Sequence, residues 1–241
     1  IFSKLFENSK LGKISNKSFE GSSIETLNVP SKFEFFEEGW LINTPKLINI
    51  NIPNDNEKYQ IKNGILFNQT YDTILFVRRD ISKFTIPKHV KRISSYSFSG
   101  CFNLEEITFE TESELEIIDN YSFSNSSLKK ITIPPHVSKI GEKIFSDCKQ
   151  LEKVEFSKDS IIDSIGPYLF HNSSIKSLMI PSSIKTIRSR SFYECKELKS
   201  VEFPKDSKLQ SIQKWSFSKS SLETITIPSS ITVIEENVFD D

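Results

Sequence analysis

The strongest constraint on the fold is a 47-residue repeat that runs from about residue 84 to residue 227. Two copies read ITIPPHVSKIGEKIFSDCKQLEKVEF (131–156) and LMIPSSIKTIRSRSFYECKELKSVEF (178–203). Strand-like segments begin alternately 23 and 24 residues apart, at Phe84, Ile107, Ile131, Val154, Leu178, Val201 and Ile225. A period of this length is typical of solenoids, in which each repeat contacts mainly its neighbours. We therefore expect residues 1–241 to form a single continuous stack.

Each 23- or 24-residue rung contains two short apolar segments separated by turns. The first alternates apolar and polar residues, as in I-T-I at 131–133, which is the pattern of a half-buried β-strand. Pro134 follows and ends this strand, because proline has no N–H for the ladder. The second segment, such as Val137 with Ile140, favours an irregular, 3₁₀ or short-strand back wall. The segment after it, SYSFSGC in one copy, is expected to form one helical or 3₁₀ turn.

Counting rungs towards the N-terminus places earlier starts near Leu5, Leu27 and Ile50, so that about ten rungs result. At ~4.8 Å per strand, the ladder would be roughly 45 Å long. Phenylalanine recurs at one place in the rung and is expected to form a buried aromatic spine with edge-to-face or offset contacts. The residues at this place are Phe19, Leu41, Phe98, Phe123, Phe145, Phe170, Phe192, Phe217 and Phe239.

One rung is too long. The stretch from Ile50 to Phe84 spans 34 residues, about ten more than a rung requires. Asn63-Gly64 is a tight-turn signal between extended segments, and residues 68–72 form a second polar turn. We expect an inserted β-hairpin or small meander over residues 57–80. Such an insertion would lie on one face of the stack. There it would either carry binding specificity or be a bulge without a binding role.

The segments TIPKHVKRISSYSFSGCFNLEEITF (85–109) and TIPPHVSKIGEKIFSDCKQLEKVEF (132–156) resemble BspA-like leucine-rich repeats, also called the Treponema pallidum type. The insertion YQIKNGILFNQTYDTILFV (59–77) resembles a hairpin interruption within that family. The resemblance implies a curved leucine-rich repeat solenoid with a parallel β-sheet on its concave face. It also implies surface proteins of bacteria and mucosal protists, with proposed roles in binding host matrix proteins or cells. Serine stands where the family usually has alanine before the phenylalanine, at Ser97, Ser122, Ser191 and Ser216.

Composition and motifs argue against several function classes. The 31 basic and 32 acidic residues nearly cancel, so no global field attracts nucleic acid or acidic lipid. Apolar runs are only a few residues long, far below the roughly 20 that a spanning helix needs, so we expect no direct membrane insertion in this segment. Cys101, Cys148 and Cys195 occupy one place in alternate rungs, ~10 Å apart, which is too far for a disulfide or a shared metal ion. We expect no enzyme activity, and no catalytic, metal or cofactor-binding residues.

The remaining candidate site is the outward side of the inner sheet, where side chains fall into two columns two residues apart. The candidate protein-binding residues are Lys83, Thr85, Glu106, Thr108, Lys130, Thr132, Lys153, Glu155, Met179, Glu202 and Thr226. Mixed polarity does not by itself identify a binding surface, because any solvated sheet face shows it. The geometry favours recognition, because concave solenoid faces usually bind partners. Asn68, within N-Q-T at the hairpin turn, is the candidate acceptor for an N-linked glycan.

Three functions are compatible with these observations. The first is a non-enzymatic recognition module at the cell surface or secreted, which binds a protein ligand such as a host extracellular matrix protein. The second is a cytoplasmic scaffold or adaptor that uses the same face. The third is a passive spacer. A signal peptide, membrane anchor or stalk in the full-length protein would favour the first, and a Met start directly before this segment would favour the second.

Overall fold

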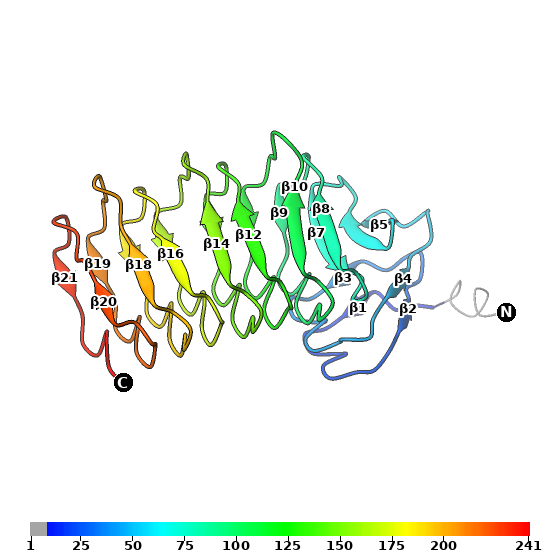
Figure 1. Cartoon of the computed structure of the whole chain (residues 1–241). Coiled ribbons are helices and arrows are strands. Elements are labelled where there is room, and N and C mark those ends of the chain that lie inside the picture. Colours follow the sequence, from blue (N-terminus) through cyan, green and yellow to red (C-terminus); the bar gives the residue numbers. More distant parts are fainter. Residues whose placement is uncertain (1–8) are drawn as a thin grey trace.

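The computed structural model describes residues 9–241; residues 1–8, and with them the expected rung start at Leu5, lie outside the described part. The described residues form a parallel β-solenoid of about ten turns, without a helix (Figure 1). Each complete turn of the later stack places one strand in a front sheet and a two-residue strand in a back wall. The leucine-rich repeat solenoid predicted from the repeat is therefore confirmed.

Within residues 9–241, nine front strands carry the first apolar segment of the rungs. They are β2 (Thr26–Asn28), β4 (Asn49–Asn51), β8 (Lys83–Ile86), β10 (Glu106–Phe109), β12 (Lys130–Ile133), β14 (Lys153–Phe156), β16 (Ser177–Met179), β18 (Ser200–Glu202) and β20 (Thr224–Ile225). The seven strands from β8 to β20 form one parallel sheet, here called the long sheet, whereas β2 and β4 pair separately. All seven expected strand starts lie in the long sheet.

The back wall consists of two-residue strands, one of the expected alternatives. They are β1 (Lys13–Ile14), β3 (Phe35–Phe36), β9 (Arg92–Ile93), β11 (Ile117–Ile118), β13 (Lys139–Ile140), β15 (Ser164–Ile165), β17 (Thr186–Ile187), β19 (Ser211–Ile212) and β21 (Val233–Ile234). The ladder is interrupted between β13 and β15, where Gly141 and Gly166 let two rungs approach closely. A Cβ atom on Gly166 would lie 2.8 Å from the carbonyl oxygen of Gly141.

The segment between back wall and long sheet is not the predicted helical or 3₁₀ turn. Its amides do donate to carbonyls three residues earlier, as Ser99 does to Tyr96 at 3.1 Å and Cys101 does to Phe98 at 3.2 Å. Tyr96 and Gly100, however, have positive φ angles of 62° and 70°. Residues in the left-handed conformation interrupt a right-handed helix, so this segment is a series of separate turns.

The aromatic spine is confirmed, as a stack of nearly parallel rings. Successive ring centroids from Phe98 to Phe239 lie 4.9–5.7 Å apart, with interplanar angles of 8–28°. The geometry is stacked and not edge-to-face, because each rung repeats the same ring orientation after one translation along the axis. The six rings from Phe98 to Phe217 are buried, whereas Phe239 is exposed and Phe19 packs edge-on against Trp40, so the buried spine is confirmed only from Phe98 to Phe217.

The insertion is a three-stranded antiparallel meander of β5 (Tyr59–Lys62), β6 (Ile65–Asn68) and β7 (Thr73–Val77). Its first turn is Asn63-Gly64, both with positive φ, as a tight hairpin requires. Strand β7 also pairs in parallel with β9, so the meander continues the back wall.

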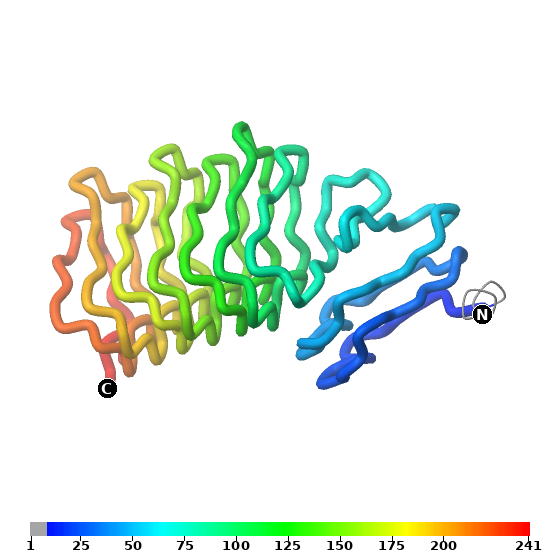
Figure 2. Tube along the Cα trace, turned by 45° about the vertical axis from the view of Figure 1, so that its right-hand side comes forward, coloured from blue at the N-terminus to red at the C-terminus, as the bar shows by residue number. Residues whose placement is uncertain are grey.

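The meander separates two hydrophobic cores. Ile65 and Phe67 belong to the core of the later rungs, whereas Leu66 and Phe76 belong to the core of the N-terminal rungs. Side chains on opposite faces of the meander thus face different cores. The insertion is therefore a buried wall between two stacks, not a bulge projecting from one face. Figure 2 shows the N-terminal rungs, in blue, running at an angle to the later rungs beyond this wall.

Candidate functional site

The eleven predicted binding residues lie on the solvent side of the long sheet. Parallel register aligns Lys83 with Glu106 and Thr85 with Thr108, which produces the two expected columns. Glu106 is half-buried and the other ten are exposed, including Thr226, which directly follows β20. Intervening residues such as Ile107 point inward and are buried, as period-2 alternation requires.

Ion pairs and hydrogen bonds organise the columns. The Glu106 carboxylate lies 3.0 Å from Lys83 Nζ and 3.3 Å from Lys130 Nζ, and these hydrogen bonds lower the pKa of Glu106. Glu155 pairs with Lys153 at 2.7 Å, which lowers the pKa of Glu155. Exposed pairs of this kind contribute little stability, so their main effect is to hold the side chains in place.

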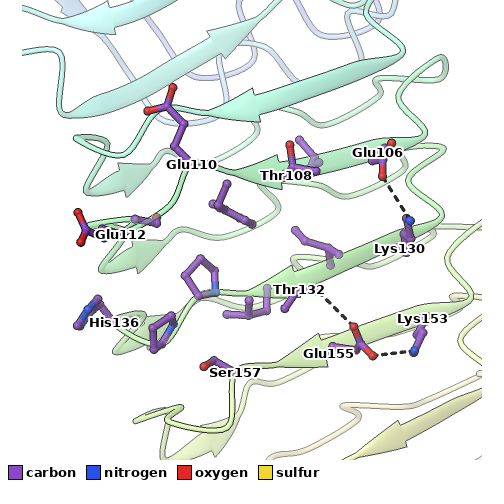
Figure 3. Close-up of a pocket in the computed structure, with 17 residues that line it drawn as sticks. Glu106, Thr108, Glu110, Glu112, Lys130, Thr132, His136, Lys153, Glu155 and Ser157 are labelled. Atoms are coloured by element: carbon purple, nitrogen blue, oxygen red, sulfur yellow. Dashed lines mark hydrogen bonds and ion pairs between the residues drawn. The ribbon is translucent and has the colours of Figure 1, made fainter.

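Two adjoining hollows lie over the long sheet. The first, of about 640 Å³, is bounded by β10, β12 and β14 and by the turns that follow them (Figure 3). The second, of about 770 Å³, extends over β14, β16 and β18. Residues that line both hollows are Thr132, Lys153, Glu155 and Ser157. Together the hollows form one trough across five strands, here called the sheet trough.

The turns that border the sheet trough add residues that the sequence analysis missed. Glu110, Glu112 and His136 line the first hollow beyond the ends of the strands (Figure 3), and Asp206 lines the second. Turn length is the sequence feature that could have indicated these residues, because the turn after β10 (110–116) is longer than the turn after β12 (134–138). The rung that starts at Glu106 has 24 residues, one more than the next, because its longer turn is partly offset by a return segment (119–129) one residue shorter than the next one (141–152).

Met179 is the apolar contact point of the sheet trough. Its side chain is 53% exposed, between Glu202 on β18 and Glu155 on β14. Within residues 9–241, Glu202 takes part in no ion pair, so its carboxylate is available to a partner. Pro181 and Pro204 line the same hollow. The arrangement offers an apolar surface beside negative charge.

The three cysteines are buried and line neither hollow. Burial raises the pKa of Cys148 to about 11 and that of Cys195 to about 12. Their Sγ atoms donate to the carbonyl oxygens of Phe123 and Phe170 at 3.1 and 2.9 Å. Neutral, buried and hydrogen-bonded thiols are structural and do not act as nucleophiles.

Asn68 stands at the end of β6, where its amide is already used. Its Nδ2 donates to Thr70 Oγ1 at 2.9 Å and to Asp72 Oδ1 at 2.6 Å, and its Oδ1 accepts from the Thr73 amide at 3.1 Å. A glycan on Nδ2 would replace one of these donated bonds. Glycosylation of Asn68 stays a prediction.

Within residues 9–241 no three His, Cys, Asp or Glu side chains are grouped so as to hold a metal ion. The same residues include no helix with the length and apolarity needed to cross a membrane.

Comparison with known proteins supports the same fold. The sequence matches the BspA-type leucine-rich repeat region in six copies, over residues 2–76, 69–164 and 163–241. A leucine-rich repeat protein from Eubacterium ventriosum is 27% identical with a TM-score of 0.84, and the match covers 95% of this chain and 61% of that one. The chain thus spans less than two thirds of that relative.

Two more distant structures share the fold. A leucine-rich cell surface protein from Faecalibacterium prausnitzii is 20% identical with a TM-score of 0.58, covering 93% of this chain and 51% of that one. A T. pallidum leucine-rich repeat protein is 18% identical with a TM-score of 0.52, covering 69% and 87%. No curated protein shows a significant sequence match.

Proposed function

Because the chain belongs to the BspA-type leucine-rich repeat family, we propose that it is a non-enzymatic protein-recognition module that binds its partner in the sheet trough. Repeat scaffolds of this kind typically bind proteins along a continuous surface. The observation that carries the proposal is the trough itself, which joins two hollows across β10 to β18. A rigid ladder holds its side chains before binding, which lowers the entropy cost of association.

The chemistry of the sheet trough suits a protein partner. Met179 supplies an exposed apolar contact, and charged side chains surround it. Interfaces commonly combine a small apolar centre with a polar rim. A partner with an apolar residue close to a basic one would fit between Glu155 and Glu202.

We further propose that the module acts at the cell surface or after secretion, in adhesion to host matrix or host-cell proteins. This location rests on the family resemblance. The alternative is a cytoplasmic scaffold. Staining intact and permeabilised source cells with an antibody against the folded chain distinguishes them. Signal on intact cells supports adhesion, whereas signal only after permeabilisation contradicts it.

Binding itself is tested with the purified protein on immobilised matrix proteins and on intact host cells. The proposal expects saturable binding to at least one of them. If the folded protein bound none of them, the adhesion function would be wrong, and a passive spacer would account for that result.

A further inference from the structure

A second surface of the solenoid carries a row of aromatic and cationic side chains. They lie on the turns between the back wall and the long sheet, two residues before the spine phenylalanine of each rung. These turns run side by side along the lower edge of the stack in Figure 1. The row consists of Tyr96, Tyr121, Lys143, Tyr168, Arg190 and Trp215 and is here called the turn ribbon.

The members of the turn ribbon contact one another in sequence. The rings of Tyr96 and Tyr121 stack with centroids 4.8 Å apart. Lys143 Nζ lies 5.3 Å from the Tyr121 centroid and 4.8 Å from that of Tyr168. The Arg190 guanidinium lies 5.5 Å from the centroid of Tyr168 and 4.0 Å from that of Trp215. From Tyr121 onward, aromatic rings and cations therefore alternate.

The backbone conformation at the six positions of the turn ribbon does not require aromatic or cationic side chains. All six residues have positive φ angles, between 54° and 62°. Glycine and asparagine adopt this conformation most easily, whereas bulky residues rarely do. A second left-handed position four residues later carries Gly100, Asn125 and Asn172 in three rungs, and Asp147, Glu194 and Lys219 in the other three. Strained positions filled with bulky aromatic and cationic groups indicate a role in binding.

A shorter aromatic row widens the surface at its centre. His171 and Tyr193 stack at 5.6 Å, and His171 meets Tyr168 edge-on at 5.8 Å. Lys219 Nζ lies 5.3 Å from the Tyr193 centroid. Lys214 Nζ lies 5.1 Å from the centroid of Trp215 at the end of the ribbon. The cations and hydroxyl groups of this surface supply hydrogen-bond donors, and the carboxylates of Glu142, Asp147 and Glu194 lie near them.

The spacing of the ribbon matches one kind of extended ligand. Tyr121, Tyr168 and Trp215 recur every two rungs, about 10 Å apart. A polyproline II helix repeats every three residues, roughly 9.3 Å. Proline has no N–H, so such a ligand presents mainly carbonyl acceptors, and its rings pack well on aromatic side chains. We propose that the turn ribbon binds a proline-rich segment in the polyproline II conformation, with acidic residues at every third position facing Lys143 and Arg190.

The test compares two synthetic peptides of equal length and charge, one with five Pro-Pro-Glu triplets and one with five Gly-Gly-Glu triplets. Binding to the full chain is measured by titration calorimetry. The proposal expects the proline peptide to bind at least about tenfold more tightly, because only it is preorganised. In Tyr168→Phe, which keeps the ring stack and removes the hydroxyl group, binding should weaken severalfold. In Lys143→Met, the dependence of binding on salt should decrease.

A variant of the sheet trough, Met179→Lys, serves as the matched control and should bind the proline peptide as the wild type does. This control separates the turn ribbon from the proposed adhesion surface. Thermal denaturation establishes that each variant is folded. Equal binding of both peptides, binding of neither, or loss of binding in Met179→Lys would overturn the proposal. So would binding of a sulfated polysaccharide alone, which would make the ribbon a site for anionic glycans.

Discussion

The guanidinium of Arg79 donates a 2.7 Å hydrogen bond to the carbonyl oxygen of Ser97, at the point where the meander meets the first turn of the later stack. Arg79 is only 2% exposed. It also donates to the carbonyl oxygen of Tyr96 at 3.3 Å and lies 5.1 Å from the ring centroid of Phe76. Arg79 thus binds carbonyl groups at an end of the stack, next to the wall that divides the two cores.

Arg79→Met should therefore destabilise the protein. The substitution keeps the apolar stem but removes the donors, and hydrogen bonds from charged groups contribute about 1.5–3 kcal/mol each. We expect the free energy of unfolding to fall by about 2 kcal/mol, measured by urea denaturation. Arg78→Met is the control, because Arg78 is a half-buried neighbour whose guanidinium pairs with Asp80 and not with the backbone of the stack. Equal effects of the two substitutions would contradict the assigned role of Arg79.

Replacing the serine that precedes the spine phenylalanine should change the free energy of unfolding in opposite directions in different rungs. Ser122 Oγ is buried without a hydrogen-bond partner, whereas Ser191 Oγ donates to the Gly166 carbonyl oxygen at 2.9 Å. Ser122→Ala should raise the free energy of unfolding by about 1 kcal/mol, because an unsatisfied hydroxyl group is costly to bury. Ser191→Ala should lower it by a similar amount. Calorimetric Tm values that shift in the same direction would show this assignment to be wrong.

The close approach of Gly141 to the backbone of the preceding rung predicts a strict need for glycine at this position. A Cβ atom on Gly141 would lie 2.6 Å from the backbone nitrogen of Asn120, whereas one on Gly12 would meet nothing within 4 Å. Gly141→Ala should destabilise the protein by about 1–3 kcal/mol, as overpacking commonly does. Gly12→Ala should leave stability nearly unchanged. Chemical denaturation of the pair measures the difference, and a neutral Gly141→Ala would disprove the close contact.

The buried thiols predict a loss of stability at high pH. The folded-state pKa is about 11 for Cys148 and about 12 for Cys195, while an unfolded cysteine titrates near about 8.5. Because the folded-state values are raised, the contribution of each thiol is complete below about pH 8.5 and is lost progressively towards its folded pKa. Cys148→Ser, which copies Ser126 of an adjacent rung, should lose less stability than the wild type between about pH 8 and about pH 10. Parallel stability curves would rule out this linkage.

The repeat predicted the long sheet well. The register that aligns Lys130 with Lys153 and Thr132 with Glu155 follows from the 23/24 period, and alternation along each strand correctly placed the two polar columns outward. The register between similar rungs is strongly determined, because shifting one strand by one residue relative to its neighbour would bury the polar column. The strand starts and the face could therefore be read from the sequence alone.

Structural features that depend on contacts between rungs of different sequence could not be predicted from the repeat. Leu66 and Phe67 are adjacent apolar residues, and nothing in the sequence indicates that they face different cores. The turn ribbon was missed because Tyr121 and Lys143 occupy left-handed positions where glycine or asparagine is the usual signal. The sheet trough also depends on turn residues such as Glu112, which lie outside the repeated columns.

Recognition of a protein partner by the sheet trough is tested by comparing the binding of matched variants. A triple variant, Lys130→Glu, Glu155→Lys and Met179→Lys, alters the trough without touching the core. Lys139→Glu, on the exposed back-wall strand β13, is the control. Apparent Kd values for intact host cells or an immobilised matrix protein should rise at least about tenfold in the triple variant, which corresponds to about 1.4 kcal/mol, and stay unchanged in the control. Equal Kd values for the wild type and the folded triple variant would show that the sheet trough is not the binding surface.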